Sequence, residues 1–238
     1  TPHNLHPKTL RATKCNDLFF YFFKKSATTS SPPRRTRFIR VPNQVQRKIL
    51  VTTKSIIFAK KTMHYNSKLY CLEGVQNIEE ENQSIILPSL EKLAIQYGIT
   101  NVYQTCDSIE GLEESLSTLL HEDRNFHDYE IIYLVFEGKG NQITIDQYNY
   151  SLEEIAEFFE GKLTGKLLHF ANTMQLDLNQ ETAQYFLDVT GAYAVSGYKN
   201  NVPLLSTVLD NQFFALYQEY DDVTEIVEEL YQKHFAIA

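Results

Sequence analysis

Short apolar runs alternate with helical patterns from residue 68 onward. The apolar runs predict five buried strands, at residues 69–72, 101–105, 131–136, 167–171 and 192–196. Helical periodicity follows the strands, over residues 88–97, 111–120, 152–160, 179–189, about 204–219 and 222–234. A polar hairpin over residues 142–150 follows the third strand. This alternation predicts an α/β fold of three layers, with a mainly parallel sheet flanked by helices.

Start and stop signals support several of these helices. Pro88 suits the first turn of a helix that Gly98 would end. Ser151 and Glu154 have the spacing of a capping box, and Gly161 would end the helix that follows them.

Charge divides the chain into two parts. Residues 1–62 contain 14 Lys+Arg and one acidic residue, Asp17, whereas residues 63–238 contain 8 Lys+Arg and 29 Asp+Glu. The second part is an acidic domain of ordinary size, which we expect to begin near Met63. The basic part is expected to be disordered or non-native. A targeting segment, a basic nucleic-acid-binding arm and translated sequence upstream of the true start are all open interpretations.

Composition narrows the class of protein. The net charge of −8 and the acidic domain argue against nucleic acid as a partner of that domain. The longest apolar run of the basic segment, residues 18–23, is far shorter than a membrane span. Cys15, Cys71 and Cys106 are too few and too scattered for a disulfide framework, so we expect a reducing, cytoplasmic compartment.

The common cofactor and metal motifs are missing from the sequence. Neither GxGxxG nor GxxxxGK[ST] follows a predicted strand, and the histidines show no HxH or HExxH spacing. We therefore expect no cofactor and no metal. His169 lies inside a strand and is predicted to be a packed residue, and Cys71 a small buried hydrophobe.

Polar residues gather where the predicted strands end. Ligands of open parallel sheets bind beyond the carboxyl ends of the strands, so a cleft is expected there. The residues at these ends are Glu73, Gly74, Cys106, Glu137, Gly138, Asn172, Thr173, Ser196 and Tyr198.

The third and fourth strand ends carry a resemblance to a known group. The stretch Ile-Ile-Tyr-Leu-Val-Phe-Glu-Gly at 131–138, a hairpin, Tyr-Ser-Leu-Glu-Glu at 150–154 and Leu-His-Phe-Ala-Asn-Thr at 168–173 follow one another. Together with residues 70–74 and 191–198, they resemble the caspase-like clan of cysteine peptidases (caspases, gingipains and CHAT-type proteins), closest to compact bacterial members. The resemblance implies a caspase-like fold with flavodoxin-like strand order.

The resemblance also implies where the catalytic residues would stand. Glu137 occupies the position of the clan's histidine base and Thr173 that of its cysteine nucleophile, while Gly138 keeps the glycine whose N–H helps to hold the oxyanion. A threonine hydroxyl does not ionise near neutral pH, and a carboxylate with a pKa near 4.3 is a weak base for it. The substitutions therefore predict an inactive domain.

Three functions follow as hypotheses. The first is a catalytically inactive caspase-like module that binds a protein or peptide, preferably basic, at the old cleft. The second is an atypical hydrolase that uses Thr173 or Cys106 as its nucleophile, and the third is a flavodoxin-like or receiver-like switch domain. Phe213 and Phe214 are expected to leave one ring outward, as a patch for self-association.

Overall fold

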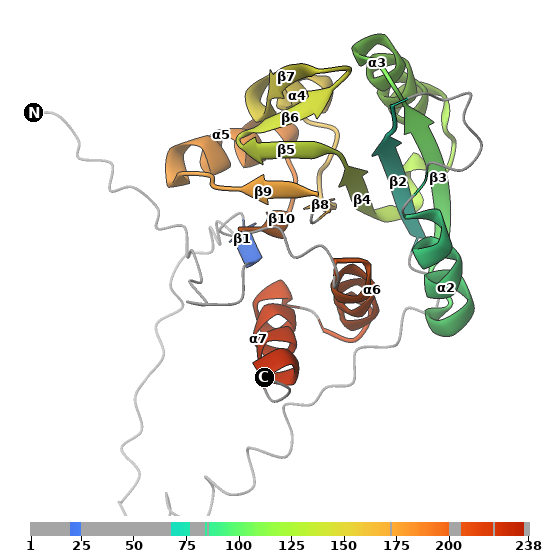
Figure 1. Cartoon of the computed structure of the whole chain (residues 1–238), viewed down its shortest axis with the longest axis vertical. Coiled ribbons are helices and arrows are strands. Elements are labelled where there is room, and N and C mark those ends of the chain that lie inside the picture. Colours follow the sequence, from blue (N-terminus) through green and yellow to red (C-terminus); the bar gives the residue numbers. More distant parts are fainter. Residues whose placement is uncertain are drawn as a thin grey trace, which may run out of the picture.

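The structure is a computed structural model that describes part of the chain. It describes residues 68–76, 84, 86–171, 173–199, 206–220 and 222–235, together with the backbone of residues 20–24. The described residues form one ten-stranded sheet between two layers of helices (Figure 1).

Five parallel strands form the main part of the sheet. Their spatial order is β3 (Thr100–Cys106), β2 (Lys68–Gly74), β4 (Tyr129–Val135), β8 (Leu167–Phe170) and β10 (Ala194–Tyr198). The four strands other than the edge strand β3 consist mostly of buried residues, because helices cover both faces of the sheet there. This confirms the predicted α/β class and the mainly parallel sheet.

Four short strands extend the sheet beyond β4 and β8. They are β9 (Met174–Leu176), β5 (Glu137–Gly140), β6 (Gln142–Ile145) and β7 (Tyr148–Ser151), in this spatial order. β5 pairs in parallel with β9, and β5, β6 and β7 pair antiparallel in sequence. The predicted hairpin is β6 and β7, whereas β5 and β9 were not predicted.

Helices form a layer on each side of the sheet. α3 (Ile109–Ser117), α4 (Leu152–Phe158) and α5 (Gln180–Thr190) pack in one apolar cluster. α2 (Leu87–Tyr97), α6 (Ser206–Tyr217) and α7 (Val223–Phe235) pack in the other. A π-helix, Thr118–Glu122, and a 3₁₀ turn, Phe126–Asp128, connect α3 to β4. Within the described residues, no helix has the length and apolarity needed to cross a membrane.

The helix boundaries follow the signals in the sequence. Gly98 ends α2 in the left-handed conformation, with φ 67°. Ser151 and Glu154 form the predicted capping box at the start of α4.

One strand of the sheet comes from the basic N-terminal segment. β1 (Phe20–Lys24) pairs antiparallel with β10, in register from Phe20 opposite Tyr198 to Lys24 opposite Ala194. The expectation that residues 1–62 are disordered or non-native otherwise falls on residues outside the described ones. The aromatic run at 19–23 has high β-propensity, and a sheet edge accepts such a segment through backbone hydrogen bonds.

The expectation that α6 leaves one phenylalanine ring outward is wrong. Phe213 and Phe214 are both fully buried. The Phe213 ring stacks on His169 at 4.9 Å between centroids, and the Phe214 ring meets Tyr133 edge-on at 5.0 Å. Both rings therefore hold α6 to the sheet and leave no aromatic patch for self-association at this place.

Candidate functional site

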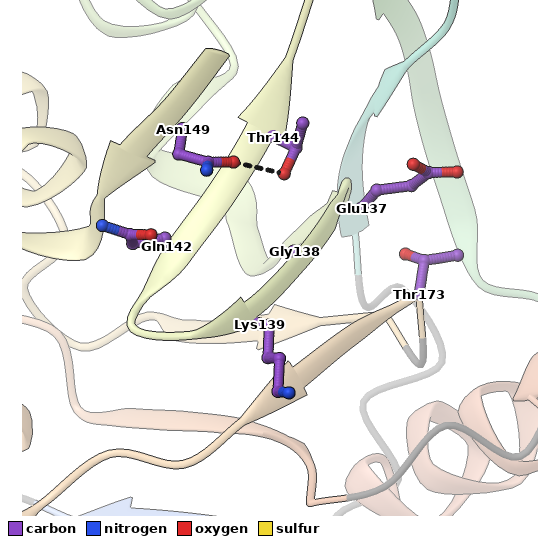
Figure 2. A pocket seen from close by; sticks show the side chains of 7 residues that line it. All are labelled: Glu137, Gly138, Lys139, Gln142, Thr144, Asn149 and Thr173. Atoms are coloured by element: carbon purple, nitrogen blue, oxygen red, sulfur yellow. Dashed lines mark hydrogen bonds between the residues drawn. The ribbon is translucent and has the colours of Figure 1, made fainter. Parts of the chain in front are cut away.

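Two hollows meet at Glu137 and Thr173, beyond the ends of β2, β4 and β8. The larger, of about 620 Å³, is lined by Glu137, Gly138, Lys139, Gln142, Thr144, Asn149 and Thr173 (Figure 2). The smaller, of about 290 Å³, is lined by Glu73, Gly74, Val75, Gln76, Val135, Phe136, Glu137 and Thr173. We call the two hollows together the cleft.

Two strand interruptions place Glu137 beside Thr173. β4 ends at Val135 and β5 begins at Glu137, while β8 ends at Phe170 and β9 begins at Met174. Gly138 then pairs with Met174 in parallel register. Glu137 and Thr173 come directly before these paired residues, so Glu137 at the start of β5 lies beside Thr173 just before β9, as Figure 2 shows.

The Thr173 hydroxyl forms a hydrogen bond with the backbone. Its Oγ1 donates to the carbonyl oxygen of Phe136 at 2.7 Å, while the side chain of Glu137 is exposed. A hydroxyl nucleophile must pass its proton to a general base within hydrogen-bond reach. In this geometry the hydroxyl proton of Thr173 is bound to a backbone carbonyl oxygen and not to Glu137.

Position 138 requires glycine because β5 and β6 approach each other closely there. A Cβ atom at this position would lie 2.3 Å from the carbonyl oxygen of Gln142 and 2.9 Å from the Cα of Ile143. Any larger residue would push β6 away from β5. The glycine thus shapes the larger hollow, whatever else its N–H does.

Glu73 forms part of the wall of the smaller hollow and is itself almost fully buried, with 3% of its surface exposed. Its Oε2 accepts hydrogen bonds from the hydroxyls of Tyr103 and Ser84, each at 2.6 Å. Burial and the bond to Glu73 raise the pKa of Tyr103, so its phenol remains a donor. These two donors fix the position of a carboxylate at the edge of an apolar wall.

A second group of polar residues lies in the core, behind the cleft. His169 Nε2 lies 3.0 Å from Asp210 Oδ1 of α6, and His169 Nδ1 lies 2.7 Å from Ser196 Oγ. The Tyr133 hydroxyl donates to Asp210 Oδ2 at 2.5 Å, and the Tyr198 hydroxyl donates to Oδ1. We call these five side chains the buried network.

The buried network contains Ser, His and Asp, the residue types of a hydrolase triad, but solvent and substrate do not reach them. Ser196 and His169 have no exposed surface, and Ser196 lines neither hollow of the cleft. Burial and the charge of Asp210 hold the pKa values of Tyr133 and Tyr198 well above the ordinary range, so both remain donors. The network therefore satisfies a buried carboxylate and attaches α6 to the sheet.

Comparison with known proteins places the chain in a family. The model of DUF6642, a family of unknown function, matches residues 66–238. The chain belongs to the DUF6642 family. A search of the curated proteins found no match. The DUF6642 region includes the whole cleft and the buried network and leaves β1 outside it.

Three of the residues predicted at the DUF6642 cleft lie elsewhere. Cys106 has no exposed surface and packs under α3, and burial, with the charge of Asp107, raises its pKa to about 12. Ser196 and Tyr198 belong to the buried network, because their strand is covered on both faces. Asn172 lies outside the described residues.

The sequence predicted more of the residues that line the cleft of this DUF6642 member than of the polar residues in its core. Glu73, Gly74, Glu137, Gly138 and Thr173 all line it. Lys139, Gln142, Thr144 and Asn149 were missed as lining residues, although the hairpin that carries most of them was predicted. Asp210 was missed too. Its signal is a single carboxylate on an otherwise apolar face, with Leu209, Phe213 and Phe214.

Proposed function

We propose that this DUF6642 member is a catalytically inactive caspase-like domain that binds a basic protein or peptide segment in its cleft. One observation carries the proposal. The Thr173 hydroxyl, at the position of the clan's nucleophile, donates to the Phe136 carbonyl, with Glu137 at the position of the base.

The arrangement of the strands supports the caspase-like part. Strands two, one, three, four and five of the parallel set lie side by side in that order, and a hairpin follows the third. Ligands of doubly wound sheets of this order bind beyond the carboxyl ends of the strands. The cleft lies at those ends, around the two residues that the resemblance singles out.

The chemistry of the site supports the absence of catalysis. A threonine hydroxyl whose proton is bound to a carbonyl oxygen has no base in position. Cys106, the other candidate nucleophile, is buried and stays a thiol at neutral pH, since its pKa is about 12.

Charge and shape indicate the class of partner. The acidic domain has 8 Lys+Arg against 29 Asp+Glu. The smaller hollow is lined by two carboxylates, Glu73 and Glu137, and by the apolar side chains of Val75, Val135 and Phe136. Such a surface attracts cationic segments, whose aliphatic stems pack on apolar walls. The larger hollow adds the amides of Gln142 and Asn149 as hydrogen-bonding groups.

A binding measurement tests the partner class. The full chain is titrated into fluorescent peptides of equal length, one rich in Lys and Arg and one rich in Asp and Glu, and anisotropy is recorded. We expect the basic peptide alone to bind, and Glu137→Gln to weaken it by about threefold to fivefold, as for one exposed ion pair. Glu91→Gln on α2 removes the same charge away from the cleft and serves as the control. Equal affinity of both variants and the original chain would place binding elsewhere.

A cleavage measurement tests the inactivity. The full chain is incubated with a mixed peptide library beside a Glu137→His/Thr173→Cys variant, and products are identified by mass spectrometry. We expect no cleavage by the natural chain. Cleavage that Thr173→Ala abolishes would make the protein an enzyme and overturn the proposal.

A further inference from the structure

We propose that the larger hollow of the cleft binds an extended segment in which a basic and an acidic residue stand two positions apart. The basic residue of the segment faces Glu137, and its acidic residue faces Lys139. This inference rests on the proposed function, because it specifies the charge pattern of the partner that the same site binds.

The floor of the larger hollow is one face of the strands β5 and β6. Residues of these strands alternate between the two faces of the sheet. Ile143 and Ile145 are buried in the apolar cluster that includes α4, whereas Glu137, Lys139 and Gln142 are exposed on the opposite face. The side chains of this second face line the hollow of about 620 Å³, so a ligand can reach them (Figure 2).

Glu137 and Lys139 are the two charged residues that line the larger hollow, among the described residues. Neither forms an ion pair with the other or with any other residue in the described part of the chain. Beside them lie neutral hydrogen-bonding groups, including Thr144 and Asn149, which bond to each other at 2.8 Å. A ligand with the reverse pair of charges is therefore complementary to this surface.

The strand β5 fixes the spacing of the two charges. Glu137 and Lys139 are two residues apart on one strand, so their Cα atoms are separated by about 7 Å and their side chains leave on the same face. An extended peptide has the same repeat, whereas adjacent residues of such a peptide point to opposite sides. Only residues two positions apart can therefore meet both charges. Since β6 and β9 occupy both edges of β5, the peptide lies on the face of the sheet and not along an edge.

Two peptides of identical composition test this spacing. Each contains one Lys and one Glu among serines and has blocked termini, and the two charged residues are two positions apart in one peptide and adjacent in the other. Each peptide is titrated into the full chain, and the shifts of the amide resonances of Gly138 and Lys139 are recorded. We expect the first peptide to bind about threefold to fivefold more tightly, as for one additional exposed ion pair. Equal affinities would overturn the inference.

Reversal of the charges tests the two residues themselves. Glu137→Lys and Lys139→Glu each leave two like charges in the hollow, so each should abolish the preference for the first peptide. Glu137→Lys/Lys139→Glu restores an opposite pair and should restore the preference. Both orders of the charged residues, Lys-Ser-Glu and Glu-Ser-Lys, are compared with the adjacent pair, because the exchange also reverses the direction in which a peptide fits.

A matched variant controls for the exchange of charges as such. Glu91→Lys/Lys92→Glu reverses two exposed charges on α2, away from the cleft, and should leave the preference unchanged. A Glu137→Lys/Lys139→Glu chain that prefers neither order over the adjacent pair would overturn the inference. So would a preference that survives in both single reversals.

Lys139→Gln separates this inference from the proposed function. The variant removes a cation, so it should retain the affinity of the wholly basic peptide and lose the preference for the two-residue spacing. If Glu137→Gln weakens the basic peptide but the two spacings bind equally, the binding function stands and the charge pattern is overturned. Binding of the basic peptide that does not depend on Glu137 would overturn the two together.

Discussion

Asp210 is the carboxylate on which the buried network depends. It accepts hydrogen bonds from Tyr133 and Tyr198 and lies 3.0 Å from His169 Nε2, with 1% of its surface exposed. Asp210→Asn keeps the shape of the side chain but replaces one acceptor oxygen by a donor group, so one of the two buried tyrosine hydroxyls loses its bond to residue 210. We expect the free energy of unfolding to fall by about 3 kcal/mol, measured by urea denaturation.

A matched control separates the network from a general effect of charge. Glu228→Gln on α7 removes one exposed carboxylate from the same helical layer. This variant should change the free energy of unfolding by less than about 0.5 kcal/mol. Equal losses for both variants would show that the network does not hold α6.

Cys106 should be unreactive despite its place at a strand end. Its thiol is fully buried, and its pKa is raised to about 12. A free cysteine with a pKa near 8.5 has on the order of a thousandfold more thiolate at neutral pH. We expect alkylation of Cys106 in the folded chain to be slower by at least this factor, with the urea-unfolded chain as the reference. Mass spectrometry of the labelled peptides measures the rate, and labelling at the free-thiol rate would restore Cys106 as a candidate nucleophile.

The burial of a single residue could be predicted from the sequence where the residue lies inside one apolar strand. His169 was predicted to be packed, since it lies inside an apolar strand, and it is fully buried. Its partners Asp210 and Ser196 are 41 and 27 residues away along the chain. No local pattern joins such residues, so the network could not be predicted.

The capping box at the start of α4 makes the stability of this helix depend on pH, because Glu154 belongs to it. The Ser151 side chain accepts from the Glu154 N–H, and Glu154 Oε2 accepts from the Ser151 N–H at 2.7 Å. These bonds to its charged form hold the pKa of Glu154 below the ordinary value. The folded state therefore binds this proton less readily than the unfolded state, and the carboxylate adds stability above a pH of about 4.3.

Removing the cap should expose this dependence. Ser151→Ala is expected to lower the free energy of unfolding by about 1 kcal/mol at pH 7. The difference from the original chain should shrink as the pH falls through the lowered pKa of Glu154, because protonation weakens the box in the original chain as well. Urea titrations from pH 7 to pH 3 measure it, with Glu157→Gln on the same helix as the control. A difference that stays constant over this range would contradict the role of the Glu154 charge.

Elements with their own boundary signals could be predicted, and those that depend on distant chain could not. Pro88 with Gly98 and the Ser151 capping box marked α2 and α4 close to their observed limits. β9 is only three residues long, and it is a strand because β5 and β10 lie beside it. β1 likewise depends on the open edge of β10, 170 or more residues further along the chain.

The cleft of the folded molecule forms where two neighbouring strands are interrupted. Alternating strand and helix patterns predicted a sheet with polar residues at the strand ends, and Glu73, Glu137 and Thr173 meet there. The same pattern wrongly assigned Cys106, Ser196 and Tyr198 to the cleft. Position along a strand shows which end a residue is near, but it does not show whether a helix covers that residue.

The charge of the whole domain makes binding at the cleft dependent on salt. The domain has 21 more acidic than basic residues, with 29 Asp+Glu against 8 Lys+Arg. Between 0.1 and 1 M salt the screening length falls from about 10 Å to about 3 Å, so the attraction of a basic peptide should be largely lost. We expect its affinity for the full chain to fall by about tenfold over this range, measured by anisotropy.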